Sequence, residues 1–260
     1  MNGRHIPLEG NLNLRDLGGY ETDDGRRVRR GCLFRSDELH ALTDSDLAAV
    51  AGLGIRVVFD LRNAEERVAR PNRLPPDVEL LERVSPSTGG AVLTPEQQIA
   101  TGALPEPDDE HFASVYTALL DRLAPELRII LERAVDAPAR PLLFHCAAGK
   151  DRTGLTAALL LGLLGVPEAV ILDDYELTST YFTPRRMESL AAVMSEHGVA
   201  DARVRPLLEA RRPVLATALR RLQERWGGFD GYATDHLAID ADLPERLRAA
   251  LLIPLDAASI

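Results

Sequence analysis

The sequence has few cysteines and few long apolar runs, and each scarcity excludes a class of protein. Its two cysteines, Cys32 and Cys146, are too few for a disulfide framework, so we expect a reducing compartment. The longest apolar stretch, residues 155–166, is too short to cross a bilayer. Residues 1–10 lack the apolar segment of a secretory signal. We therefore predict a cytoplasmic protein without stable membrane insertion.

Positive charge is also scarce. Thirty basic side chains against forty acidic ones leave a formal charge of -10, which argues against a sequence-independent interaction with nucleic acid or anionic lipid. Basic residues do cluster within residues 26–30 and 203–225, and we interpret both clusters as solvated faces that would still steer an anionic substrate. The six histidines are scattered, without the spacing of a metal site. We therefore predict neither a nucleic-acid partner nor a metal or other cofactor.

What the sequence does contain is typical of a soluble globular protein, with 45% apolar and 27% charged residues. Runs of apolar and β-branched residues predict strands at 28–34, 55–59, 78–81 and 142–145. Apolar spacing and capping residues predict helices at 44–50, 111–124, 126–136, 214–226 and 243–252, with a further apolar helix from Thr153. This alternation predicts an α/β fold, in which helices flank a central, mostly parallel sheet and the C-terminal part is helical.

We expect one domain over residues 1–260, interrupted by two excursions. Residues 85–109 are rich in proline, glycine and acids and have weak periodicity, which is typical of a long connection. Residues 178–204 form a second, helical candidate. Either segment is a candidate lid, and the pattern alone does not choose between them.

The chemistry is concentrated in residues 145–154, which read His-Cys-Ala-Ala-Gly-Lys-Asp-Arg-Thr-Gly. The cysteine ends a predicted strand, and the arginine lies six residues later, where a helix begins. Backbone N–H groups in such a loop, at a helix N-terminus, can bind all the equatorial oxygens of a phosphoryl group. The small residues at 147–149 let the backbone come close to the phosphate. We therefore predict that phosphate binds to Ala147, Ala148, Gly149, Lys150, Asp151 and Arg152.

Each polar side chain of this string has a predicted role. The inward dipoles and cations stabilise a thiolate, so we expect Cys146 to be the nucleophile. The planar guanidinium of Arg152 can bind two phosphate oxygens at once. We expect the Thr153 hydroxyl to donate to the sulfur and His145 to orient the loop from behind. Lys150 adds positive charge at the mouth, which favours substrates with more than one phosphate.

This string resembles the signature loop of a bacterial tyrosine phosphatase family, His-Cys-x-x-Gly-Lys-Asp-Arg-Thr-Gly. Residues 13–20, 33–39, 60–62, 174–178 and 226–232 are similar to the other landmarks of that family, so the resemblance covers almost the whole chain. It implies a phosphotyrosine-phosphatase-like fold and a phosphoric monoester hydrolase that acts through a phosphocysteine intermediate. The implied substrate is phosphotyrosine, and some relatives also act on phosphoserine or phosphoinositides. The partner is then a phosphorylated protein or phospholipid, and residues 178–204 correspond to the lid helices of relatives.

One carboxyl group must protonate the leaving oxygen and later activate water. Asp151 is the first candidate, since it lies within the loop and the resemblance gives it a functional place. Asp60, at the end of a neighbouring strand, is the second, although an ion pair with Arg62 or Arg35 explains it equally well. Some relatives carry a further aspartate after the third strand, where this chain has Ser-Pro-Ser at residues 85–87.

Other interpretations of the string are weaker. A nucleotide-binding Walker loop requires serine or threonine directly after its lysine, whereas Asp151 follows Lys150. Cys146 as an ordinary buried thiol would leave the strand, loop and helix context unexplained. A phosphate-recognising module without turnover would not need the intact string. A different cysteine enzyme, such as a sulfur transferase or an arsenate reductase, is another alternative. Arsenate reduction normally requires further redox cysteines, and Cys32, which we predict to serve packing, is the only one available.

Overall fold

A five-stranded, mostly parallel sheet forms the centre of the protein, whose computed structural model describes residues 3–82, 93–106 and 108–255. The strand order is β1 (Arg15–Asp16), β3 (Leu33–Ser36), β6 (Leu142–His145), β4 (Val57–Asp60) and β5 (Glu79–Glu82). Only β1 is antiparallel to its neighbour, β3. A separate ribbon pairs β2 (Arg26–Val28) with β7 (Leu252–Pro254). The predicted fold class is confirmed.

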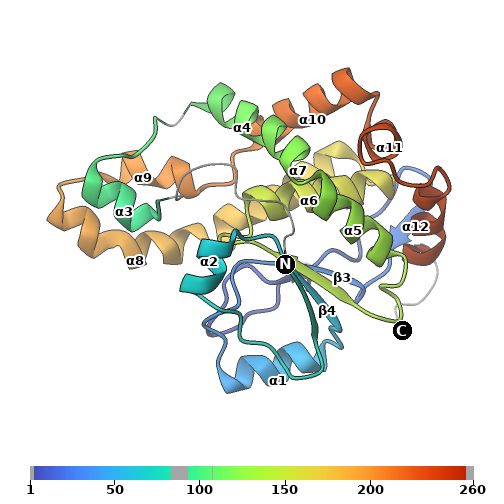
Figure 1. Ribbon diagram of the computed structural model, residues 1–260, viewed down its shortest axis with the longest axis horizontal. Coiled ribbons are helices and arrows are strands. Elements are labelled where there is room, and N and C mark those ends of the chain that lie inside the picture. Colours follow the sequence, from blue (N-terminus) through green and yellow to red (C-terminus); the bar gives the residue numbers. More distant parts are fainter. Residues whose placement is uncertain (1–2, 83–92, 107, 256–260) are drawn as a thin grey trace.

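Helices cover both faces of this sheet because its central strands are apolar on both sides. Phe34, Val58 and Leu143 pack in one cluster beneath α1 (Asp44–Gly52). The alternate positions of the same strands, such as Phe59 and Phe144, join the main core with α5 (Ala124–Ala134) and α6 (Asp151–Leu163). Figure 1 shows α1 on one side of the strands and α5 and α6 on the other. Burial on both faces is expected for parallel strands between two helical layers.

The predicted helices are confirmed with small shifts of their ends. Thr43 caps α1 through a capping box, as expected for the residue before the predicted helix. The remaining helices, apart from three described below, are α2 (Ala64–Ala69), α4 (Asp109–Arg122), α7 (Glu168–Tyr181), α10 (Arg212–Trp226), α11 (Phe229–Gly231) and α12 (Leu243–Leu251), with a π-helical turn at Tyr232–His236. The prediction of one strand over residues 28–34 was wrong. Gly31, at φ 72°, turns the chain, so that β2 and β3 belong to different sheets.

Three helices form a lobe of their own beside the body, at the left of Figure 1. We call α3 (Pro95–Thr101), α8 (Thr183–Glu196) and α9 (Asp201–Leu208) the helical lobe. Its small apolar cluster is separate from the two clusters on the sheet and contains Ile99, Met187, Leu190, Met194, Val204 and Leu208. The lobe therefore brings together parts of both predicted excursions, while residues 85–92 and 107 lie outside the described residues.

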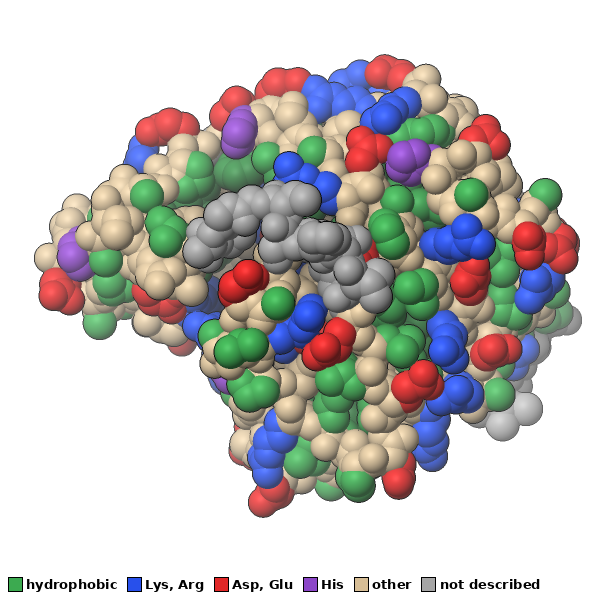
Figure 2. Space-filling view, in the orientation of Figure 1, with side chains coloured by type: hydrophobic (Ala, Val, Ile, Leu, Met, Phe, Trp, Pro, Cys, Tyr) green, Lys and Arg blue, Asp and Glu red, His purple; other side chains and the backbone are tan. Residues whose placement is uncertain are grey.

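The surface is charged without large areas of one sign, as Figure 2 shows for one face. The arginines within residues 203–225 form ion pairs with acidic side chains: Arg203, Arg205, Arg211, Arg212, Arg220, Arg221 and Arg225. This cluster is therefore a neutralised, solvated face, as predicted. In the described ranges, we find no helix with the length and apolar character needed to span a bilayer.

Candidate active site

Residues 146–150, which we call the cysteine loop, connect the end of β6 to the start of α6. The turn requires a glycine at position 149, whose φ is 64°. A Cβ atom at Gly149 would lie 2.6 Å from the carbonyl oxygen of Ser36 in β3. The loop is therefore pressed against the end of the neighbouring strand, with no room for a side chain on that side.

The carbonyl oxygens of Ala147, Ala148 and Gly149 point away from the inside of the cysteine loop and toward neighbouring segments of the protein. Because the carbonyl of one residue and the N–H of the next point in opposite directions across a trans peptide, the N–H groups of residues 148–150 face the other side of the loop. Among the described residues, no hydrogen bond uses these N–H groups. The outward bonds are from Glu38 N–H to Ala147 O at 3.2 Å, from Asn13 Nδ2 to Ala148 O at 3.1 Å, and from Arg35 Nη2 to Gly149 O at 2.8 Å.

A buried ion network fixes the groups that hold the loop. Asp174 of α7 pairs with Arg15 Nε at 3.1 Å and with Arg35 Nη1 at 2.5 Å, and it accepts a hydrogen bond from the Tyr20 hydroxyl. Burial raises the pKa of Asp174, but the two arginines outweigh burial and lower the pKa to about 2. Residues from three landmark segments thus form one scaffold beneath the loop.

Arg152 is held by a carboxylate that sequence reasoning missed. Glu66 accepts from Arg152 Nη1 at 2.6 Å and from Nη2 at 2.8 Å, and the Leu61 carbonyl accepts a further bond from Nη1. Of the five N–H groups, the Nε–H and one Nη2–H have no partner among the described residues, and they lie on the same edge of the guanidinium. Burial lowers the pKa of Arg152, but the bonds to Glu66 and the charge of Cys146 raise it overall. Two N–H groups on one edge of the fixed guanidinium are therefore available to bind an anion.

Cys146 lies at the base of the loop and is 1% exposed. The predicted hydrogen bond from Thr153 to the sulfur is not formed, because the buried Thr153 hydroxyl has no partner among the described residues. His145 lies behind the loop, as predicted, with Nδ1 3.2 Å from the carbonyl oxygen of Cys146. Burial lowers the pKa of His145 to about 4, so the imidazole is neutral near pH 7.

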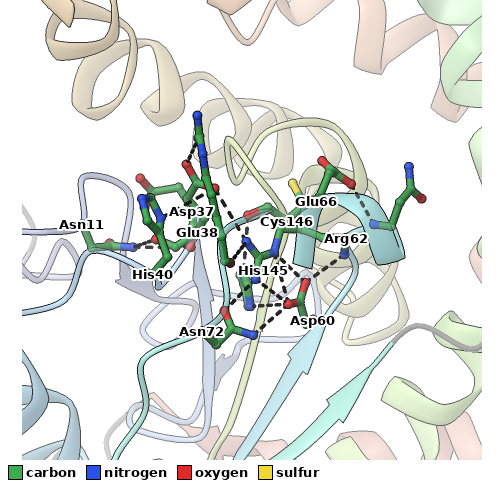
Figure 3. Close-up of polar contacts among 12 residues, drawn as sticks. Asn11, Asp37, Glu38, His40, Asp60, Arg62, Glu66, Asn72, His145 and Cys146 are labelled. Atoms are coloured by element: carbon green, nitrogen blue, oxygen red, sulfur yellow. Dashed lines mark hydrogen bonds and ion pairs between the residues drawn. The ribbon is translucent and has the colours of Figure 1, made fainter. Parts of the chain in front are cut away.

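Asp60 is enclosed by structural partners. Its carboxylate accepts bonds from Arg62 Nη2 and from Asn72 Nδ2, both at 2.8 Å, and lies 3.6 Å from His145 Nε2. Figure 3 shows these contacts converging on Asp60. Burial raises the pKa of Asp60, but the hydrogen bonds from Arg62 outweigh burial and lower it to about 2. The predicted alternative of an ion pair with Arg62 is what the structure contains.

Asp151, in contrast, lies at a pocket. Its side chain is 41% exposed and its Oδ1 accepts a 2.6 Å hydrogen bond from the Tyr116 hydroxyl. The neighbouring Lys150 extends to the carbonyl oxygen of Leu207, at the end of α9, with a distance of 2.5 Å from Nζ. The pocket has a volume of about 550 Å³ and is lined by loop residues on one side and by lobe residues on the other. The two candidate acids therefore have opposite environments.

The sequence of residues 6–253 matches the tyrosine phosphatase family. The chain belongs to this family. A candidate tyrosine-protein phosphatase of Cupriavidus necator is 34% identical over 249 residues, which cover 92% of this chain and 87% of the relative. A tyrosine-protein phosphatase of Nostoc commune is 32% identical over 203 residues, covering 76% and 67%. The triple specificity protein phosphatase PtpB of Mycobacterium tuberculosis is 31% identical over 278 residues, covering 94% and 98%.

Family membership confirms the predicted resemblance and the predicted activity. This tyrosine phosphatase is a phosphoric monoester hydrolase, and its partners are phosphorylated substrates. The cysteine loop is consistent with this activity. Both of its cysteines are buried and free of disulfides. Cys32 serves packing, as predicted, and burial raises its pKa to about 11.

Three polar residues of the phosphatase site were missed in the sequence. Glu66 is the third residue of α2, where its carboxylate also accepts from the Asn63 N–H, and the Asn-x-x-Glu pattern of a capping box was the available signal. Tyr116 lies in a helix that was predicted, but its spacing gave no reason to face Asp151. Asp37 lines the pocket although it is only 4% exposed. Burial raises the pKa of Asp37 to about 7.

Proposed function

We propose that this phosphatase hydrolyses phosphotyrosine through Cys146, Arg152 and Asp151. The observation that carries the proposal is the orientation of the cysteine loop: surrounding residues hold the carbonyls of Ala147, Ala148 and Gly149, and no described residue occupies the Nε edge of Arg152. Ala147, Ala148, Gly149, Lys150 and the first turn of α6 then supply N–H groups to the phosphate.

In the first step, the Cys146 thiolate attacks phosphorus as the bond from phosphorus to the phenolic oxygen breaks. Asp151 donates its proton to that oxygen, so that neutral tyrosine leaves. The guanidinium of Arg152 follows the equatorial oxygens into the transition state, and Glu66 keeps it in the plane required. The product of this step is a phosphocysteine.

In the second step, the Asp151 carboxylate takes a proton from water, whose oxygen attacks phosphorus. The bond from phosphorus to sulfur breaks, inorganic phosphate leaves, and the thiolate of Cys146 is restored. The buried Thr153 hydroxyl has no partner in the described part of the chain, and we assign it to the leaving sulfur at this stage. Asp60 has no part in proton transfer in this scheme, because its carboxylate is fully buried and accepts bonds from Arg62 and Asn72, away from the pocket lining.

The pocket walls favour an aryl phosphate over a lipid headgroup. Phe182, Leu104 and Leu208 line the pocket with apolar surface, which suits the ring of phosphotyrosine. Lys150, predicted to favour a second phosphate, is occupied by the Leu207 carbonyl. A panel of phosphotyrosine and phosphoserine peptides and soluble phosphoinositides tests this choice. A higher kcat/KM for any phosphoinositide than for every phosphotyrosine peptide would refute it.

Substitution of the nucleophile tests the mechanism. We expect Cys146→Ser to abolish turnover of p-nitrophenyl phosphate while a phosphotyrosine peptide still binds. Cys32→Ser is the matched control, and it should retain turnover because Cys32 lies in the core rather than in the loop. Arg152→Lys should lower kcat by about a hundredfold or more, since lysine cannot bind two oxygens in a fixed plane. Turnover by Cys146→Ser would remove this residue from the mechanism.

A further inference from the structure

Asp151 is the end of a chain of hydrogen bonds that reaches into the core. The Tyr116 hydroxyl donates to Asp151 Oδ1, and the hydroxyl of Tyr175 lies 2.6 Å from that of Tyr116. Both tyrosines are buried, at 3% and 1% exposed, and their rings meet edge to face with centroids 6.2 Å apart. Two helices, α4 and α7, thus place their hydroxyls side by side beneath an exposed carboxylate.

The direction of donation along this chain is fixed. An ionised carboxylate only accepts, so the single proton of the Tyr116 hydroxyl points to Asp151 Oδ1. The Tyr116 oxygen then accepts from the Tyr175 hydroxyl. Burial, and next the charge of Asp151, raise the pKa of Tyr116 well above 10, so it remains a donor at every pH at which the enzyme works.

The hydrogen bond also distinguishes the two oxygens of Asp151. Oδ1 is engaged by Tyr116, and Lys150 Nζ lies 3.7 Å from the same atom. Oδ2 accepts no hydrogen bond from any residue in the described part of the chain. A half-exposed aspartate without a fixed partner would sample several rotamers, and a proton donor must stay within hydrogen-bond reach of the leaving oxygen.

We propose that Tyr116, supported by Tyr175, is the positioning residue for the general acid. Tyr116 holds Oδ1 of Asp151, and the other oxygen, Oδ2, gives a proton to the leaving oxygen and then takes one from water. Tyr116 itself exchanges no proton with the substrate. This inference rests on the proposed role of Asp151 as the acid.

A comparison of two leaving groups tests the inference. Tyrosine, with a pKa of about 10, needs protonation as it leaves, whereas p-nitrophenol is a much better leaving group. Tyr116→Phe should lower kcat/KM about tenfold for a phosphotyrosine peptide and less than about twofold for p-nitrophenyl phosphate. Tyr175→Phe should give the same pattern with a smaller loss, about threefold. An equal loss on both substrates would overturn the inference.

A matched control separates positioning from the loss of any buried hydroxyl. Tyr232 is also buried, and its hydroxyl donates to the carbonyl of Leu120, one turn along the same helix as Tyr116. Tyr232→Phe should leave the ratio of the two kcat/KM values unchanged. If Tyr116→Phe does not fold, judged by its thermal transition, Tyr175→Phe carries the same two-substrate test.

The double variant distinguishes failure of this inference from failure of the proposed mechanism. Asp151→Ala should itself lose far more with phosphotyrosine than with p-nitrophenyl phosphate, and adding Tyr116→Phe to it should change neither value. If Asp151→Ala shows no dependence on the leaving group, the acid assignment fails. If it does show this dependence but Tyr116→Phe multiplies the loss, then Tyr116 acts elsewhere and only the positioning role fails.

Discussion

The two sides of the pocket are built in different ways. On the body side, the cysteine loop rests on buried charges, of which Arg15, Arg35 and Asp174 are each at most 2% exposed at their side chains. On the lobe side, ion pairs such as that of Arg203 with Glu106 are 43% and 76% exposed. Exposed pairs contribute little to stability, whereas breaking a buried pair is costly. The body, with its buried ion pairs, therefore holds the reacting groups. The lobe, whose ion pairs are exposed, forms the opposite wall of the pocket that the substrate enters.

The start of α8 and the end of α9 lie together where the chain passes between the body and the lobe. The Thr183 hydroxyl donates to the carbonyl of Leu208, and Ser179 accepts from the backbone N–H of Ala210 at 2.8 Å. These bonds tie the start of α8 to the end of α9, and Lys150 adds a bond from the cysteine loop to the Leu207 carbonyl. A lid role for residues 178–204 remains a prediction, which the position of α8 at the pocket wall supports.

The largest expected effect comes from disrupting the buried ion network on the body side of the pocket. Asp174→Asn leaves Arg15 and Arg35 buried without a counter-charge, so we expect a loss of about 3–5 kcal/mol in the free energy of unfolding, measured in urea. Activity should fall as well, since Arg35 holds the Gly149 carbonyl. Asp173→Asn is the control on the same helix, because the side chain of Asp173 is 68% exposed. A loss below about 1 kcal/mol for Asp174→Asn would show that the network does not anchor the loop.

Substitution of one glycine on each side of the pocket gives the next largest expected effect. Gly149 and Gly102 both have φ near 70°, at 64° and 70°, but only at Gly149 would a Cβ atom meet backbone. Gly149→Ala should cost about 2–3 kcal/mol and lower kcat/KM by about a hundredfold, because the loop must shift. Gly102→Ala, at the end of α3 in the lobe, should cost only the left-handed strain of about 1–2 kcal/mol and leave kcat unchanged. Equal kinetic effects would contradict a rigid body side.

The sequence was sufficient to predict the strands, the helices and the position of the cysteine loop. It was not sufficient to predict the side-chain contacts between these elements. The apolar run before Cys146 and the small residues after it place the loop between β6 and α6, because both signals are local. Glu66 and Tyr116 were missed because their roles depend on which helix packs beside which loop. The choice between Asp151 and Asp60 also needed the fold, since Asp60 ends one buried strand, Asp151 follows another through the cysteine loop, and their surroundings decide between them.

The pH dependence of stability isolates one body-side carboxyl. Burial raises the pKa of Asp37 from 3.8 to about 7, so its contribution to stability is fully present below pH 3.8 and is lost as the pH rises through about 7. Relative to the wild type, Asp37→Asn should gain about 1 kcal/mol between pH 6 and pH 8. The comparison of two proteins is needed because His145, with its pKa lowered from 6.5 to about 4, contributes the opposite slope below pH 6.5. Parallel pH profiles would show that Asp37 is ionised throughout.

The smallest effect is expected on the lobe side. A double-mutant cycle on Arg203→Ala and Glu106→Ala should give a coupling energy below about 0.5 kcal/mol, because water and salt screen this exposed pair. The value of kcat/KM should stay within about twofold of the wild type, since neither residue lines the pocket. A coupling above about 2 kcal/mol would mean that the lobe is anchored as firmly as the loop. In that case the difference between the two sides would lie in burial alone and not in how strongly each is held.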